Sequence, residues 1–125
     1  MEKLDWYKIS NKEINSLPEG SGLYIFSVLL KNQEYGVFYV GQSLNIRTRV
    51  AQHFSDSEPN DKLRNFLKKN FTFKISYARC REGLLDKLEK YLIKHYSPVF
   101  NNQDGNGNVI ESCTLPNVIV WKYNC

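Results

Sequence analysis

The feature that most constrains the fold is a pair of short apolar runs separated by four polar residues. Residues 22–30 and 35–41 are rich in β-branched, aromatic and aliphatic side chains, and residues 31–34 between them are polar. Runs of this length and composition are typical of β-strands. A connection of four polar residues is short enough for a hairpin loop. We therefore expect two neighbouring antiparallel strands.

Beyond residue 41 the apolar residues recur every four positions instead of every two. Ile46, Val50 and Phe54 follow this spacing, which predicts one face of a helix. Ser43 or Asn45 can cap its start, because a short polar side chain there accepts a hydrogen bond from the first turn.

The remaining periodic segments predict further elements. We expect a second helix over about 59–69 with Ser57 as its cap, a third strand over 71–77, and a third helix over about 84–96 that ends before Pro98. Residues 118–121 form a late strand candidate. With residues 1–21 as a lead-in, the order is β-β-α-α-β-α. This order predicts a single α+β domain over residues 1–125, with a small, mostly antiparallel three-stranded sheet flanked by helices.

Composition excludes several classes of protein. The chain has 125 residues, of which 42% are hydrophobic, enough to bury a core. Its three cysteines, Cys80, Cys113 and Cys125, are an odd number without CxxC spacing, which argues against a disulfide framework and a structural zinc site. The absence of a secretory leader and of an apolar run near ~20 residues predicts a cytoplasmic protein with no membrane partner. A net charge of +4 is compatible with nucleic-acid binding.

One charged residue lies inside the apolar arc of the third predicted helix. At about 100° per residue, Glu89 falls between the directions of Ile93 and Tyr96. An ionised carboxylate is costly to bury unless it is paired with a cation. The pattern leaves two interpretations open, which are a salt bridge to a neighbouring Arg or Lys and a metal ligand.

Polar residues on the first predicted helix also suggest chemistry. Arg49 and His53 are four residues apart and share one face, whereas Arg47 lies on the far margin of the apolar stripe. Tyr24 and Tyr39 stand on the two strands that we expect to be neighbours. Each of these residues alone is explained by packing or solvation, and the set together points to a site.

Six short motifs in this chain follow one another in a fixed order. They are Gly22-Leu23-Tyr24, Tyr39-Val40-Gly41, Arg49 eight positions after that glycine, His53, Glu89 in a leucine-rich helix, and Pro98-Val99-Phe100-Asn101. In this order and spacing the sequence resembles the GIY-YIG nuclease family over about residues 17–102, which leaves 103–125 as a C-terminal extension. Gln42 follows the second motif, where some members of the family have lysine.

The resemblance implies a metal-dependent endonuclease that hydrolyses phosphodiester bonds in DNA with one Mg²⁺ or Mn²⁺ ion. Glu89 would hold the metal, and Arg49 would bind the non-bridging phosphate oxygens. Tyr24 would orient or deprotonate the attacking water, Tyr39 would position the water or the phosphate, and His53 would accept or relay a proton.

Further residues are candidates for contacts with the substrate. Arg47 and Asn101 are expected near it, with Asn101 more suited to holding the loop after the third helix. Basic residues around the site are further candidates for phosphate contacts: Lys62, Lys68, Lys69, Lys74, Arg79 and Arg81.

Three alternatives stay open. The chain can be a nucleic-acid binding module that keeps the fold without cutting, a nuclease that acts on RNA, or a structural domain with a buried Glu–Arg pair. The sequence predicts no particular oligomeric state.

Overall fold

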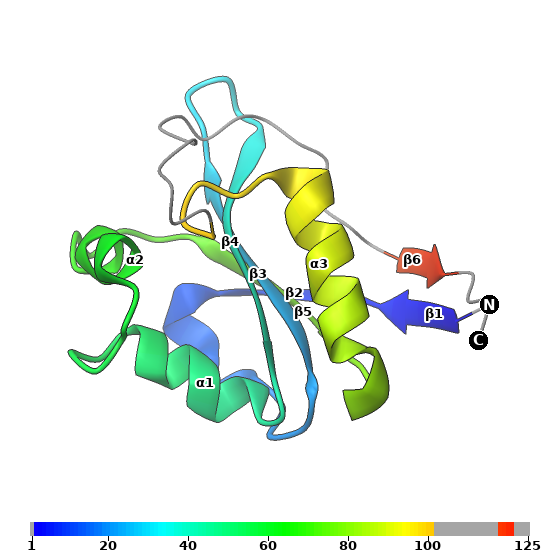
Figure 1. Cartoon of the computed structure of the whole chain (residues 1–125). Coiled ribbons are helices and arrows are strands. Elements are labelled where there is room, and N and C mark those ends of the chain that lie inside the picture. The colour runs from blue at the N-terminus through cyan, green and yellow to red at the C-terminus, as the bar shows by residue number, and fades with distance from the viewer. Residues whose placement is uncertain (1, 102–117, 122–125) are drawn as a thin grey trace.

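The computed structural model describes residues 2–101 and 118–121 (Figure 1). Its main sheet is antiparallel with the strand order β2-β5-β3-β4, and β1 pairs with β6 in a separate antiparallel ribbon. The elements in chain order are β1 (Glu2–Asp5), β2 (Tyr7–Ser10), the 3-10 helix η1 (Asn11–Ser16), β3 (Gly22–Leu29), β4 (Tyr35–Ser43), α1 (Ile46–His53), α2 (Asp61–Leu67), β5 (Lys74–Arg79), the 3-10 helix η2 (Glu82–Leu84), α3 (Leu85–Tyr96) and β6 (Val118–Trp121).

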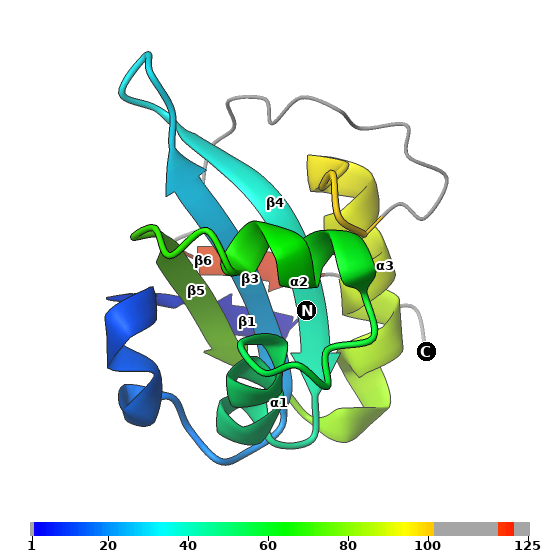
Figure 2. The ribbon, with the colours of Figure 1, turned by 90° about the vertical axis from the view of Figure 1, so that its left-hand side faces the viewer.

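The main sheet is the middle layer of the molecule. Successive side chains on a strand point to opposite faces, so the central strand β3 contributes to two cores. Leu23 and Ile25 of β3 pack with the apolar residues of α3, whereas Tyr24 and Phe26 pack with those of α1 and α2. Figures 1 and 2 show α1 and α2 on one face of the sheet and α3 on the other.

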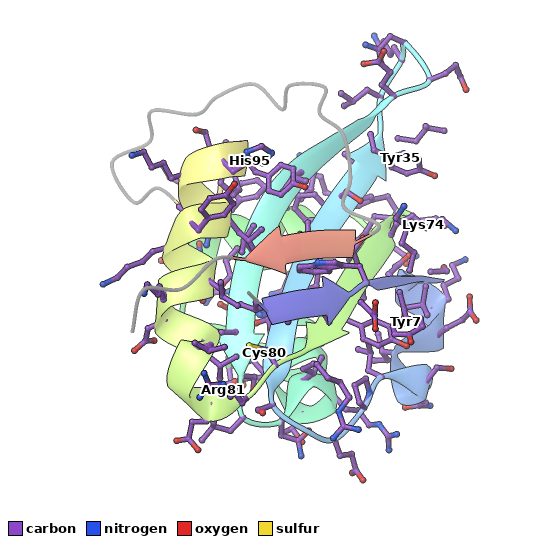
Figure 3. The ribbon with its side chains drawn as sticks, turned by 90° about the vertical axis from the view of Figure 1, so that its right-hand side faces the viewer. Tyr7, Tyr35, Lys74, Cys80, Arg81 and His95 are labelled. Atoms are coloured by element: carbon purple, nitrogen blue, oxygen red, sulfur yellow. The ribbon has the colours of Figure 1, made fainter. Side chains whose placement is uncertain are left out.

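The β1–β6 ribbon covers part of the face that α3 occupies. Leu4 of β1 and Trp6, which follows it, are buried in the same cluster as the apolar residues of α3. Figure 3 shows the ribbon lying across the sheet beside α3, over the side where Cys80 and Arg81 are labelled. On the other side of the sheet, β4 is an edge strand that contacts both α1 and α3.

The structure confirms the predicted α+β class and most of the predicted elements. The hairpin of β3 and β4, the helices α1 and α3, and the late strand β6 all form where the sequence places them. Asn45 is the cap of α1, with its side chain accepting from the Thr48 N–H at 3.1 Å. The helix α3 ends at Tyr96, and Ser97 takes a left-handed conformation with φ 46° just before Pro98.

Other details differ from the sequence prediction. Within residues 2–101 the main sheet has four strands instead of three, because part of the expected lead-in, Tyr7–Ser10, pairs with β5 as an edge strand. Four residues are too few to show an alternation. The helix α2 begins at Asp61 with Asn60, not Ser57, as its cap. The strand β5 begins at Lys74, three residues later than the predicted start at residue 71. The single-domain assignment for 1–125 stays a prediction, because most of 103–125 lies outside the described residues.

Two glycines of the hairpin are required by close packing. Gly41 pairs with Tyr24 across β3 and β4, and a Cβ atom on Gly41 would overlap the ring and hydroxyl of Tyr24. A Cβ atom on Gly22 would collide with the backbone oxygen of Ala78 on β5 and with Ile46 of α1. The glycines of both motifs therefore let neighbouring elements approach, and the one at residue 41 makes room for a site tyrosine.

We expect Gly41→Ala to lower the free energy of unfolding by about 1–3 kcal/mol, because the added methyl group must displace the buried Tyr24 ring. Gly83→Ala is the matched control, since the nearest heavy atom to its new Cβ is Arg81 Nη1 at 4.0 Å. The control should change stability by less than about 0.5 kcal/mol. Urea unfolding of the two variants tests this, and equal midpoints for Gly41→Ala and wild type would contradict it.

Candidate functional site

The side chains predicted for the site converge at the β4 edge of the sheet. Tyr24 pairs with Gly41, and Gly41 is two residues from Tyr39 on β4, so both tyrosines lie on the same sheet face. Helix α1 packs on that face and brings Arg49 and His53 to them. The ring centroid of His53 is 5.6 Å from that of Tyr24 and 5.0 Å from that of Tyr39.

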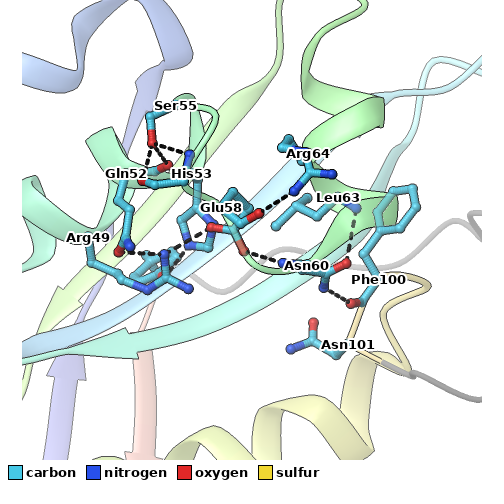
Figure 4. Close-up of polar contacts among 12 residues, drawn as sticks. Arg49, Gln52, His53, Ser55, Glu58, Asn60, Leu63, Arg64, Phe100 and Asn101 are labelled. Atoms are coloured by element: carbon cyan, nitrogen blue, oxygen red, sulfur yellow. Dashed lines mark hydrogen bonds and ion pairs between the residues drawn. The ribbon is translucent and has the colours of Figure 1, made fainter.

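A chain of buried polar contacts runs from Tyr24 to Arg49. The Tyr24 hydroxyl lies 2.6 Å from His53 Nε2, and His53 Nδ1 lies 2.8 Å from Glu58 Oε2. The same carboxylate oxygen accepts a hydrogen bond from Arg49 Nη1 at 3.0 Å. Tyr24, His53 and Glu58 are almost completely buried, and the side chain of Arg49 is 26% exposed. Figure 4 shows the Arg49, His53 and Glu58 part of this chain.

The charges in this chain are set by burial and by Arg49. Burial, together with the nearby Arg49 charge, lowers the pKa of His53 from 6.5 to about 4 despite the opposing effect of Glu58. Burial alone would raise the pKa of Glu58, but the Arg49 hydrogen bond, the His53 charge and the Asn60 backbone N–H outweigh it and lower the pKa. At neutral pH the site therefore contains a neutral His53, an ionised Glu58 and a charged Arg49.

The two tyrosines differ in their access to solvent. Tyr24 has no exposed surface, and burial raises its pKa well above 10, with Tyr39 adding to the rise and Arg49 opposing it. Tyr39 is half-buried, and its pKa is also raised by burial, with a hydrogen bond and the charge of Arg49 opposing the rise. The expected role of Tyr24 as a proton acceptor stays a prediction, and both its burial and its pKa argue against a phenolate there.

Glu89 stands on α3, which packs on the opposite face of the sheet, yet its charge acts on both tyrosines. Its side chain is half-buried, and burial raises its pKa, with hydrogen bonding to the side chain and backbone of Gln42 opposing the rise. A partly buried carboxylate whose charged form is destabilised by burial gains from a bound cation. An oxygen donor of this kind suits Mg²⁺ or Mn²⁺.

Glu89 does not belong to a larger cluster of metal-binding side chains in the described part of the chain. Within residues 2–101 and 118–121, no group of three or more His, Cys, Asp and Glu side chains is placed to hold a metal ion. Mg²⁺ commonly keeps several waters and uses one or two carboxylates together with phosphate oxygens of the substrate. The donor set at Glu89 therefore fits a metal that completes its coordination with water and substrate.

A cleft opens beside Arg49. It has a volume of about 260 Å³ and is lined by Tyr39, Arg49, Glu58, Pro59, Asn60, Phe100 and Asn101. A phosphate group in this cleft would meet the guanidinium of Arg49 and the half-buried Tyr39. The cleft thus brings together residues from β4, α1, the loop before α2 and the segment after α3.

Arg47 and Asn101 make structural contacts. Arg47 Nε donates to the Leu17 carbonyl at 2.8 Å, as suits a residue on the far margin of the helix stripe. The amide of Asn101 donates to the Val40 carbonyl and accepts from the Val40 N–H, both at 2.7 Å. Because β4 is an edge strand, this amide satisfies backbone groups that a neighbouring strand would otherwise pair. A substrate role for either residue stays a prediction.

The basic residues named from the sequence are distributed over several elements. Lys68 pairs with Asp56 at 3.1 Å, and Lys69 Nζ lies 5.5 Å from the centroid of the Phe66 ring. Their expected phosphate contacts stay predictions, as do those of Lys62, Lys74, Arg79 and Arg81.

Glu58 is the site residue that sequence reasoning missed. It lies in a polar segment, residues 55–60, where an acidic residue ordinarily faces solvent. Neither periodicity nor the family motifs mark it. A buried Glu–Arg pair was among the alternatives drawn from the sequence, and the structure forms such a pair with Glu58 instead of Glu89.

Comparisons with known proteins agree with this fold. The sequence model of one protein family, the UvrC-like GIY-YIG domain, matches residues 20–102. UvrABC system protein C of Dictyoglomus thermophilum is 35% identical over 92 residues, which are 74% of this chain and 14% of that protein. The same protein of Protochlamydia amoebophila is 36% identical over 92 residues, with shares of 72% and 14%. The chain thus spans about a seventh of the length of these relatives.

A solved structure shares the fold. The GIY-YIG N-terminal endonuclease domain of UvrC from Thermotoga maritima, bound to magnesium as its catalytic divalent cation, superimposes with a TM-score of 0.54. It is 25% identical to this chain, and the match covers 73% of this chain and 93% of that domain.

The fold and the matching domain family define the class as a GIY-YIG domain. The chain belongs to the UvrC-like GIY-YIG domain family, which confirms the resemblance drawn from the six motifs. Across its described part, the structure has no helix long and apolar enough to cross a membrane.

The neutral, buried His53 should make the domain sensitive to mild acid. Its pKa of about 4 in the folded state lies below the ordinary 6.5, so the unfolded chain takes up the proton first as pH falls. The stability that the neutral His53 contributes is fully present above pH 6.5, and it is lost as the pH falls toward 4. We expect the free energy of unfolding to fall by about 2 kcal/mol between pH 7.5 and pH 5, measured by urea unfolding.

The variants separate this effect from other titrations. His53→Gln should remove most of the decrease, whereas His95→Gln, which changes an exposed histidine, should keep it. An unchanged pH dependence in His53→Gln would show that another group causes the acid sensitivity.

Proposed function

We propose that this domain hydrolyses phosphodiester bonds in DNA, using one Mg²⁺ or Mn²⁺ ion held by Glu89. The observation that carries the proposal is the cleft in which Arg49, fixed by a buried carboxylate, lies beside the half-buried Tyr39. A permanently charged planar group anchored next to a polar hydroxyl is suited to a phosphodiester, because it binds non-bridging oxygens and their growing charge.

Arg49 would hold the phosphate. Its Nη1 atom is already engaged by Glu58 and by Gln52 Oε1, each at 3.0 Å. The guanidinium is therefore pinned along one side, and its other N–H groups can bind a phosphate without first being ordered. Such preorganisation lowers the cost of stabilising charge in the transition state.

Tyr39 is better placed than Tyr24 to position the attacking water. It lines the cleft and is half-buried, whereas Tyr24 is fully buried with its hydroxyl at His53. Tyr24 and His53 would instead hold the floor of the site and keep bulk water from Arg49. His53 is neutral at the working pH, so one of its ring nitrogens can accept a hydrogen bond.

Glu89 would bind the metal at the β4 edge. When bound, the ion supplies Lewis-acid stabilisation of the leaving oxygen and of developing negative charge. Gln42, in the place where some family members have lysine, donates from Nε2 to Asp86 Oδ1 at 2.5 Å and lies close enough to Glu89 to oppose the rise of its pKa.

The comparisons support the metal and a nuclease activity. The Thermotoga maritima domain binds magnesium as its catalytic cation, and it aligns with 73% of this chain. The curated relatives are UvrABC system protein C from several organisms, each matched over about a seventh of its length. Nuclease activity of the present chain is inferred from the endonuclease domain that it resembles and from the cleft, and DNA is the substrate that we propose.

We expect the domain to nick supercoiled plasmid DNA with Mg²⁺ or Mn²⁺, and Glu89→Gln to lower the single-turnover rate at least ~100-fold. Arg49→Lys should give a loss of similar order, because lysine keeps the charge but lacks the planar fork. Glu82→Gln is the matched control, since this exposed carboxylate precedes the same helix and should leave the rate within about 3-fold.

Other outcomes would redirect the proposal. A wild-type rate in Glu89→Gln would exclude Glu89 as the metal ligand. Cleavage of an RNA but not of the plasmid would change the substrate class. Binding to DNA or RNA without cleavage under either metal would favour the non-cleaving module.

A further inference from the structure

We propose that Glu58 is a positioning residue for cleavage, which fixes the guanidinium of Arg49 and the ring of His53 in the orientations that the reaction needs. This inference rests on the proposed function, and it concerns a residue that none of the family motifs includes. Glu58 does not act on the substrate itself. It acts through the two side chains that it holds.

The burial of Glu58 is the first observation. The side chain is 1% exposed, yet it carries a full negative charge opposite Arg49 and the neutral His53. Removing a carboxylate from water is costly unless its oxygens are well bonded. Both oxygens are engaged here, Oε2 by Arg49 and His53, and Oε1 by the Asn60 backbone N–H at 3.2 Å.

The backbone of Glu58 is fixed from both sides. Its N–H donates to the Ser55 carbonyl at 3.3 Å, and its carbonyl accepts from Arg64 Nη1 of α2 at 2.8 Å. The next polar residue, Asn60, caps α2 and donates to the Phe100 carbonyl at 2.8 Å (Figure 4). The segment 55–60 thus connects the end of α1, the start of α2 and the segment after α3. A carboxylate on this support has little freedom to turn.

The effect on Arg49 is directional. Glu58 and Gln52 accept from the same Nη1 atom, so they fix one corner of a planar group. The rest of the guanidinium then faces the cleft and Tyr39 as a rigid fork. Without Glu58 the arginine keeps its charge but loses the contact that sets its plane.

The effect on His53 is the choice of tautomer. Nδ1 lies 2.8 Å from Glu58 Oε2, and although the ring N–H does not point along this line as in a hydrogen bond, an ionised carboxylate attracts a proton on this nitrogen and repels a lone pair, which favours the tautomer protonated on Nδ1. In the neutral ring Nε2 is then the acceptor, and the Tyr24 hydroxyl donates to it at 2.6 Å. Glu58 therefore also sets the direction of the buried Tyr24 hydroxyl.

The test compares two substitutions with a matched control. Glu58→Gln keeps the volume and one acceptor but loses the charge, and Glu58→Ala loses all three. Asp56→Asn removes one negative charge from the same segment, where the Asp56 side chain is 91% exposed. Single-turnover cleavage is measured with saturating and subsaturating plasmid, at a temperature well below the unfolding midpoint of every variant.

We expect the saturated rate to fall about 10-fold in Glu58→Gln and about 100-fold in Glu58→Ala, with a smaller change in apparent affinity, because positioned groups act mainly in the transition state. Asp56→Asn should stay within about 3-fold of wild type. If both Glu58 variants lose stability but keep the wild-type rate while folded, Glu58 has a merely structural role and the proposal fails.

A spectroscopic measurement is independent of cleavage. The chain has two histidines, so ¹⁵N-histidine labelling gives two rings, and His95→Gln assigns them. We expect the wild-type His53 to carry its proton on Nδ1 at pH 7, and Glu58→Ala to move a large share of it to Nε2. Glu58→Gln should keep the Nδ1 proton, since its carbonyl can accept it.

Cleavage and the histidine spectra together distinguish a failure of the proposed function from a failure of the positioning role of Glu58. A chain that cuts no nucleic acid but shows the expected ring tautomers contradicts the proposed function and leaves the orientation of His53 by Glu58 standing. A wild-type His53 protonated on Nε2 contradicts the positioning role even if the chain is an active nuclease.

Discussion

The ring of Tyr24 lies directly on Gly41 of the neighbouring strand, and this contact determines where the site can form. Because Gly41 has no side chain, the tyrosine occupies space above β4 that would otherwise be filled, and its hydroxyl reaches α1. The hairpin register sets this pairing, and the same register brings Tyr39 to the same face. A shift of β4 by one residue would send Tyr39 to the α3 face and leave Tyr24 on the α1 face, as side chains alternate between faces.

Around this contact the protein stabilises a buried polar chain that a purely apolar core would avoid. Tyr24, His53 and Glu58 are each almost inaccessible to water, and Arg49 connects them to the cleft. Isolated polar groups at such depth are destabilising. They are tolerated because each is bonded to the next, and because the segment 55–60 is fixed to two helices. The result is an arginine held ready for an anion.

The two helical layers contribute different parts of the site. Helix α1 supplies Arg49 and His53 on one face of the sheet, and α3 supplies Glu89 from the other, so they meet at the edge strand β4. An edge strand leaves backbone groups unpaired, and Asn101 satisfies those of Val40 with both ends of its amide. A substrate can approach this edge without entering the core, which suits a long polymer such as DNA.

The amino-acid sequence by itself determined the hairpin, the helices α1 and α3 and the family, and it named five side chains of the candidate site, since local periodicity and motif spacing are properties of the chain alone. The edge strand β2, the cap Asn60 and the role of Glu58 depended on tertiary structure. The segment Tyr7–Ser10 is too short to show a periodic pattern. In the sequence Glu58 cannot be told from an exposed acidic residue, because its burial depends on the contact between its loop and α1. The protonation of His53 was likewise decided by burial and by Arg49, which no sequence spacing reveals. Which residues share a strand or helix face is encoded locally, but which groups lose contact with water is decided only when distant segments pack.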